Sequence, residues 1–158
     1  MELQIGSPAP EFSLPDDSGN TRSLKEFSGK KLVIFFYAKD NTAGCTCQAQ
    51  GYGELYEGFR SLGYEVVGIS RDSAASHARF KQKLALPYSL LSDPDRTAHE
   101  AYGVWKEKTM YGKKSMGTER SSFVIDENGT LVGIFRKVNS KTNPADMLKF
   151  CTEIQKGL

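Results

Sequence analysis

Hydrophobic residues along this chain occur in short continuous runs that alternate with longer segments of helical spacing. The run from Leu32 to Tyr37 contains no charged side chain, which is typical of a strand buried on both faces. From about residue 44 to 62 apolar residues then recur three or four positions apart, which predicts a helix. The later expected elements are a strand over 65–70, a helix capped near Asp72 or Ser73 and ending before Pro87, a short strand over 90–92, a short helix over 96–102, strands over 121–125 and 131–137, and a helix over 144–156.

Turn signals complete this picture. The sequence Asp-Glu-Asn-Gly at 126–129 separates the last two strands and predicts a hairpin. Near the N-terminus an extended segment over 6–10 leads to a turn at 16–20. Strands that alternate with helices and end in a hairpin predict an α/β fold with a mixed central sheet covered by helices. Since no repeat, linker or low-complexity segment divides the chain, we expect residues 1–158 to form a single domain with an N-terminal extension.

Composition and charge change this picture little. The 158 residues carry a formal charge of +2, which is too small to indicate nucleic acid as a partner. A group of lysines around Tyr111 predicts a solvated basic loop; its members are Lys106, Lys108, Lys113 and Lys114. The three cysteines form no even disulfide framework and no secretory leader is visible, so we expect a cytoplasmic protein. No apolar run approaches the roughly 20 residues of a membrane span, so we expect no membrane association.

Cys45 is the residue that most strongly suggests chemistry. It follows the buried run that ends at Tyr37 and lies where the first helix is expected to begin. The start of a helix offers free backbone N–H groups and the positive end of the helix dipole, and both favour a thiolate. Because the thiolate is the nucleophilic form of cysteine, Cys45 is a candidate reactive residue. The alternative is that Cys45 is a small buried hydrophobic residue.

Several further segments carry a resemblance to a known family. These segments are Gly6 to Phe12, Phe35 to Asp40, Gly68 to His77, Leu91 to Asp95, Ala101 to Trp105, Met110 to Lys113 and Gly117 to Phe123. In these segments the chain resembles the peroxiredoxins of the bacterioferritin comigratory (Q-type) branch, which have a thioredoxin-like fold and reduce hydroperoxides at a cysteine. The segments cover nearly the whole chain in register, which is far more specific than a short cysteine motif.

The resemblance implies a role for each matching residue. Cys45 matches the peroxidatic cysteine, whose thiolate attacks hydrogen peroxide or an organic hydroperoxide and becomes a sulfenic acid. Thr42 matches a threonine that bonds the thiolate and orients the peroxide, although it could equally be a helix cap. Arg120 matches an arginine that lowers the thiol pKa. The backbone N–H groups of Gly44 and Cys45 could donate to the peroxide oxygens. The resemblance implies no cofactor and no metal.

The chain also departs from the family pattern. Ala38 and Ala43 replace two prolines, which predicts a looser active-site loop with less protection against stray oxidants. Gln48 replaces a common glutamate and so removes an acidic partner near the helix start. Gln50 and Lys81 occupy the two positions where a resolving cysteine is usual. The departures therefore affect turnover more than they affect the nucleophile.

Three routes could regenerate the reactive cysteine. Cys47 could form a strained disulfide with Cys45, but residues two apart do not face each other on a helix, so the helix containing Gly51 and Gly53 would first have to unwind. Cys151 lies on the last helix, where a packing role is expected. The third route is attack by an external thiol such as thioredoxin, glutaredoxin or a small-molecule thiol. We favour the external thiol, narrowly over Cys47, and expect a monomer or a weak homodimer.

Two other classes of function remain open at this point. A thiol-disulfide oxidoreductase would need two residues between its cysteines, whereas Cys45 and Cys47 are separated by one. A copper-binding module of thioredoxin-like fold could use these two sulfurs together with His77 or His99. Both histidines fall on expected helices, where we predict an exposed or capping role. A purely structural domain would leave the combination of Thr42, Cys45 and Arg120 unexplained.

Overall fold

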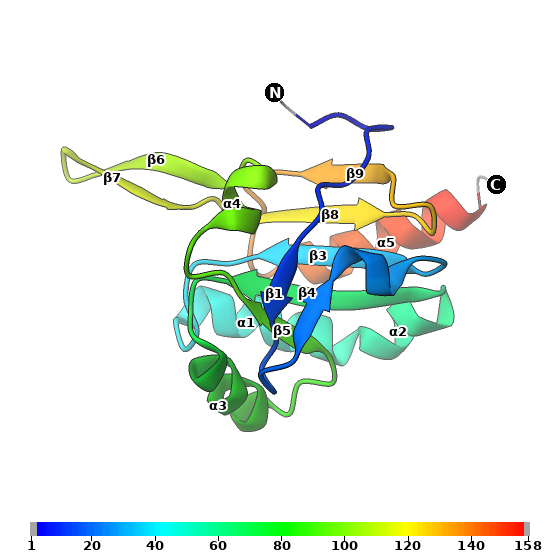
Figure 1. Ribbon diagram of the computed structural model, residues 1–158, viewed down its shortest axis with the longest axis horizontal. Helices are drawn as coiled ribbons and strands as arrows, with labels where there is room; N and C mark the ends of the chain where they lie inside the picture. The colour runs from blue at the N-terminus through cyan, green and yellow to red at the C-terminus, as the bar shows by residue number, and fades with distance from the viewer. Residues whose placement is uncertain (1–2, 157–158) are drawn as a thin grey trace.

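A five-stranded mixed sheet forms the centre of the protein (Figure 1). The computed structural model describes residues 3–156. The strand order is β5-β4-β3-β8-β9, in which β3 (Lys31–Phe36), β4 (Tyr64–Ser70) and β5 (Ser89–Ser92) are parallel. The strands β8 (Ser121–Ile125) and β9 (Leu131–Phe135) run antiparallel to their neighbours and form the expected hairpin. The predicted α/β class with a mixed sheet is therefore confirmed.

The central strand β3 divides the hydrophobic core in two. Successive side chains of a strand point to opposite faces, and here both faces are covered. The six residues from Leu32 to Tyr37 are all 0% exposed. Leu32, Ile34 and Phe36 pack in one cluster, whereas Val33, Phe35 and Tyr37 pack in the other. The continuous apolar run of this strand is thus explained by burial on both sides.

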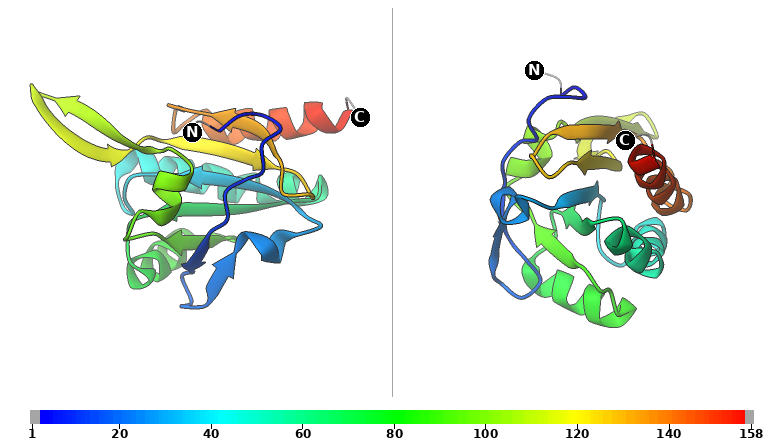
Figure 2. Two further views of the ribbon diagram at one scale, coloured as in Figure 1. Left: turned by 45° about the horizontal axis from the view of Figure 1, so that its top comes forward. Right: turned by 90° about the vertical axis from the view of Figure 1, so that its right-hand side faces the viewer.

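Helices cover both faces of the sheet (Figure 2). One face is covered by α1 (Ala43–Glu54), α2 (Tyr56–Ser61) and α5 (Asn143–Lys156), and α3 (Ala74–Leu84) contributes Phe80 to the same cluster. The other face is covered by α4 (Thr97–Ala101), the short 3-10 helix η1 (Leu24–Phe27) and the N-terminal segment. Within that segment β1 (Ser13–Pro15) pairs with β2 (Thr21–Ser23), a pair that the sequence analysis did not predict.

The prediction of one long helix over 44–62 is wrong in one respect. The segment forms two helices, α1 and α2, which are separated at Leu55. The glycines of α1 have a packing role. A Cβ atom on Gly51 would lie 2.8 Å from Cγ of Pro144, so glycine permits α5 to approach α1 closely. Gly53 and Gly58 likewise face side chains of neighbouring segments. The glycines weaken the helix propensity of this segment, but they allow neighbouring side chains to pack closely against it.

The predicted basic loop is also wrong, because residues 105–118 form a β-hairpin. Its strands are β6 (Trp105–Met110) and β7 (Lys113–Thr118), which pair with each other and form a sheet separate from the central one. The loop prediction failed because most of the described side chains of these strands are exposed, so the strands have no alternating hydrophobic pattern. Among the residues that the structure describes, no helix is both long and apolar enough to cross a membrane.

Candidate active site

Cys45 lies in the first turn of α1, directly after the loop that follows β3. Its side chain is 1% exposed. Arg120 directly precedes β8, which pairs with β3 so that Ser121 faces Phe36. This strand register brings Arg120 to the end of β3, where its Nη2 donates to Sγ of Cys45 at 3.3 Å. The structure thus joins two predicted site residues that are 75 positions apart in the sequence.

The surroundings of Cys45 favour its thiolate form. Burial by itself raises the pKa of the thiol, but hydrogen bonding from the Thr42 side chain and the Lys39 backbone opposes it, as does the Arg120 guanidinium. The net result is a Cys45 pKa below the ordinary value for cysteine. These contacts therefore favour the thiolate form of Cys45.

Thr42 occupies the N-cap position of α1 without making a side-chain cap hydrogen bond. Its hydroxyl donates to the carbonyl oxygen of Lys39 at 2.8 Å and also interacts with Cys45. A hydroxyl has one proton to donate, so it can serve the carbonyl or the thiolate at a given moment. The position of Thr42 is compatible with its predicted role beside the sulfur, and the alternative of a conventional side-chain cap is not observed.

Gly44 leaves room for the arginine. A Cβ atom at this position would lie 3.4 Å from Nη2 of Arg120 and 3.4 Å from Oγ of Ser140. Gly44 and Cys45 both lie in the first turn of α1, where backbone N–H groups have no acceptor within the helix. These N–H groups are available to a small polar molecule that reaches the sulfur.

A buried chain of amides orients Arg120, a role that no sequence pattern had indicated. Nη1 of Arg120 donates to Oε1 of Gln48 at 2.6 Å, and Nε2 of Gln48 donates to Oδ1 of Asn143 at 3.0 Å. The same Oδ1 accepts hydrogen bonds from Tyr52 at 2.6 Å and Ser122 at 2.9 Å. Gln48 was expected only to remove an acidic partner. Because it is neutral, it holds the guanidinium without cancelling its charge.

The loop before α1 is anchored without the family prolines. Ala38 and Ala43 are both exposed. Asp40 is only 3% exposed and accepts hydrogen bonds at one oxygen from Tyr37 at 2.6 Å and at the other from Ser76 at 2.8 Å. This second oxygen also lies 2.8 Å from Nδ1 of His77. Buried polar contacts therefore fix the loop, and no local sequence signal had indicated Asp40.

The two histidines are buried, so the prediction of exposed or capping residues is wrong. Both are 0% exposed. Nδ1 of His77 contacts Asp40, and its Nε2 lies 2.9 Å from the carbonyl oxygen of Leu91. Nδ1 of His99 lies 2.7 Å from Asp93, and its Nε2 lies 2.9 Å from Oγ1 of Thr118. Since every ring nitrogen already has a partner, neither histidine is available to bind copper with the cysteine sulfurs.

The other two cysteines differ from Cys45. Cys47 is partly buried and lies two positions further along the regular part of α1. Cys151 is 0% exposed, and burial raises the pKa of its thiol to about 12. The predicted packing role of Cys151 is thus confirmed by its place in the core. All three cysteines are free.

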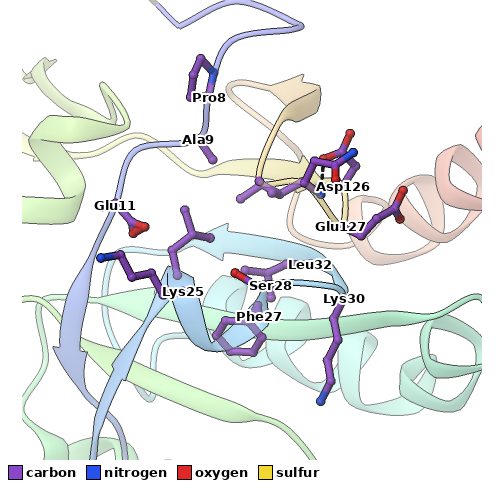
Figure 3. Close-up of a pocket in the computed structure, with 14 residues that line it drawn as sticks. Pro8, Ala9, Glu11, Lys25, Phe27, Ser28, Lys30, Leu32, Asp126 and Glu127 are labelled. Atoms are coloured by element: carbon purple, nitrogen blue, oxygen red, sulfur yellow. Dashed lines mark hydrogen bonds between the residues drawn. The ribbon is translucent and has the colours of Figure 1, made fainter.

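The fold also contains a cavity that Cys45 does not line (Figure 3). It is lined by residues that include Phe27, Leu32 and Asp126. Leu32 stands near the start of β3, whereas Cys45 follows the end of that strand. The candidate active site is therefore the environment of Cys45 and not this cavity.

Comparison with known proteins identifies the family of the chain. Residues 5–134 match the AhpC/TSA family. The chain is 43% identical to a putative peroxiredoxin Bcp of Coxiella burnetii, covering 94% of this chain and 98% of the relative. It is 42% identical to peroxiredoxin Bcp of Bacillus subtilis, covering 94% and 95% of the two chains.

Solved structures give the same result. The PrxQ structure of Xylella fastidiosa superposes with a TM-score of 0.92 at 30% identity and covers 98% of this chain and 99% of its own. A bacterioferritin comigratory protein of Xanthomonas campestris superposes with a TM-score of 0.86 at 35% identity, covering 90% of each chain. These neighbours confirm the thioredoxin-like peroxiredoxin fold. The chain therefore belongs to the AhpC/TSA family and is a peroxiredoxin of the bacterioferritin comigratory (Bcp, or Q-type) branch.

Proposed function

We propose that this protein is a thiol-dependent peroxidase that reduces hydrogen peroxide and organic hydroperoxides at Cys45. The observation that carries the proposal is the contact of 3.3 Å between Nη2 of Arg120 and Sγ of Cys45, at a thiol whose pKa is lowered. The solved bacterioferritin comigratory protein of Xanthomonas campestris was studied for alkyl peroxide reduction, which agrees with this substrate class. The three free cysteines favour a cytoplasmic, reducing location.

The first half of the reaction oxidises the sulfur. The Cys45 thiolate attacks the distal oxygen of the hydroperoxide with an electron pair, and the O–O bond breaks. The distal oxygen stays on sulfur as a sulfenic acid, and the departing alkoxide or hydroxide takes a proton and leaves as alcohol or water. Arg120 and the N–H groups of Gly44 and Cys45 donate to the oxygens on which negative charge develops. Thr42 orients the peroxide beside the sulfur.

The second half of the reaction returns two electrons. An external thiol attacks the sulfenic sulfur, water leaves, and a second thiol reduces the resulting mixed disulfide. Because Cys45 is 1% exposed, a reductant as large as thioredoxin or glutaredoxin reaches it only after the first turn of α1 opens. Cys47 on the same turn is a second candidate for attack after this opening. We retain the external thiol as the main route, acting on a single domain of residues 1–158 that is a monomer or a weak homodimer.

Replacement of the nucleophile tests the proposal. Cys45→Ser should abolish peroxide consumption supported by dithiothreitol. Cys151→Ser is the matched control, because it removes a buried cysteine distant in sequence, and it should retain turnover. The assignment is wrong if the Cys45 variant consumes peroxide at the rate of the unmodified protein.

A further inference from the structure

The hairpin of β6 and β7, here called the arm, extends from the end of the molecule toward which β3 points (Figures 1 and 2). Its strands pair in register from Trp105 with Thr118 to Met110 with Lys113. The second strand ends two residues before Arg120, which contacts Cys45. The arm therefore leaves the protein body at the active-site edge of the sheet.

The base of the arm is fixed to the body. The guanidinium of Arg71 lies 4.6 Å from the ring centroid of Trp105, and that of Arg96 lies 5.1 Å from it. On the second strand, Oγ1 of Thr118 lies 2.9 Å from Nε2 of the buried His99. Arg71 and Arg96 belong to the loops after β4 and β5, which end at the same edge of the sheet as β3. These contacts hold the arm in one direction beside the active site.

The arm is the basic part of an otherwise almost neutral chain. Its four lysines and one glutamate give residues 105–118 a formal charge of +3, whereas the whole chain carries +2. The remaining residues together therefore carry a charge of −1. Lys108, Lys113 and Lys114 are exposed. An arm of this charge attracts an acidic surface and repels a second copy of itself.

The tip of the arm carries an aromatic residue that its own fold does not require. Tyr111 is 97% exposed and has a φ of +53°, and the following Gly112 has a φ of +78°. Two residues of positive φ form a tight hairpin turn in which asparagine, aspartate or glycine is preferred at the first position. Tyrosine is strained there, and burial offers it no compensation. Exposed tyrosine and methionine are typical of protein interfaces, and Met116 on the same arm is 50% exposed.

We propose that the arm is the docking element for a protein thiol reductant whose surface is acidic beside its reactive cysteine. The inference rests on the proposed function, in which an external thiol reduces the Cys45 sulfenic acid. The lysines attract the acidic surface, and Tyr111 supplies an apolar contact at the tip. A reductant held on the arm stands close to the first turn of α1, which must open before its thiol can reach Cys45.

Steady-state kinetics with two kinds of reductant test the proposal. Peroxide turnover is measured with reduced thioredoxin or glutaredoxin as the protein reductant, and in parallel with dithiothreitol. K113E/K114E reverses two exposed charges, and K83E/K149E is the matched control with the same change in net charge on α3 and α5. Y111N removes the aromatic ring while placing a residue that suits the turn.

The expected result separates docking from chemistry. K113E/K114E should lower kcat/KM for the protein reductant about 10-fold through slower association, with a weaker dependence on salt. Y111N should lower the same constant several-fold with the salt dependence unchanged. Neither variant should alter turnover with dithiothreitol, and the control pair should differ little from the unmodified protein in either assay.

Other results would overturn the inference in identifiable ways. Equal kcat/KM values for K113E/K114E and K83E/K149E would show that the arm does not dock the reductant. Turnover of the unmodified protein with dithiothreitol but with neither protein reductant would refute docking and leave the peroxidase function intact. A dimer in sedimentation that K113E/K114E dissociates would make the arm a contact between copies instead. Absence of turnover with every thiol would refute the proposed function itself.

Discussion

Replacing Arg120 with methionine removes a fixed positive charge that lies 3.3 Å from Sγ of Cys45. At about 4 Å and an effective dielectric constant of about 20, two opposite unit charges attract by about 4 kcal/mol. Arg120 is partly exposed, so solvent screening reduces this value, and we expect about 1.4–2.7 kcal/mol to remain. This free energy corresponds to a change of about 10-fold to 100-fold in the equilibrium between thiol and thiolate, and the Cys45 pKa should rise in Arg120→Met.

The direction of the change in the Cys45 pKa depends on which form of the thiol the arginine stabilises. A guanidinium favours the thiolate, so its removal favours the neutral thiol and raises the pKa. At a pH below the original pKa the thiolate fraction, and with it the rate of reaction with peroxide, should fall about 10-fold to 100-fold. The rate of alkylation by iodoacetamide as a function of pH measures the shift, with the modified cysteine identified by mass spectrometry in a Cys47→Ser background.

Two controls make this experiment specific. Cys151 is buried with a pKa raised to about 12, so it should remain unreactive across the same pH range. Arg120→Lys keeps the charge but loses the guanidinium fork that contacts Gln48 through Nη1 and Cys45 through Nη2, so its alkylation midpoint should lie between those of the parent and Arg120→Met. A midpoint in Arg120→Met that matches the parent would refute the role of Arg120 in ionising Cys45.

Three further changes test the fold and the turnover. Cys47→Ser should retain turnover with excess dithiothreitol. One equivalent of peroxide should add the mass of one oxygen to the unmodified protein. If the unmodified protein instead loses the mass of two hydrogens and Cys47→Ser does not, a Cys45–Cys47 disulfide is favoured. Gly51→Ala should lower the unfolding free energy by about 1–3 kcal/mol in urea titration, because a Cβ would lie 2.8 Å from Cγ of Pro144. Burial by itself raises the pKa of Asp40, but hydrogen bonds to the carboxylate lower it below its usual range. Its stabilising contribution should thus be present above about pH 4 and be lost as the pH falls through the folded-state pKa, and urea titration of Asp40→Asn should show lower stability at pH 7 with a smaller acid-induced decline.

The local pattern of hydrophobic and polar residues predicted the strands of the central sheet. The run from Leu32 to Tyr37 predicts a strand from the polarity of six adjacent residues, and the structure buries all six. Cys45 could be identified in the same way, since its position between a strand and a helix depends only on its neighbours. The resemblance to the peroxiredoxins then assigned Arg120, because the residues that flank it match the family. None of these inferences requires a distance between remote parts of the chain.

The strands of the arm escaped prediction for a related reason. Most of the described side chains in Trp105–Met110 and Lys113–Thr118 are exposed, so their polarity does not alternate as it does in a strand that covers a core. Backbone pairing joins the two strands along their length, and the side chains add polar contacts such as the ion pair of Lys114 with Glu107 at 3.8 Å. Hydrogen bonds between backbones leave little trace in side-chain polarity, and the sequence therefore suggested a loop.

Tertiary structure alone decided which remote residues meet. The antiparallel register of β3 and β8 places Arg120 within 3.3 Å of the Cys45 sulfur, and the approach of α5 to α1 places Asn143 against Gln48. Asp40 likewise anchors the loop only because α3 places Ser76 and His77 beside its carboxylate. Hydrophobic periodicity determines which face of an element is buried, but it does not specify the element that covers that face. The sequence by itself therefore determined the strands of the central sheet and the candidate nucleophile, whereas packing between distant segments determined the charge and the hydrogen bonds around Cys45.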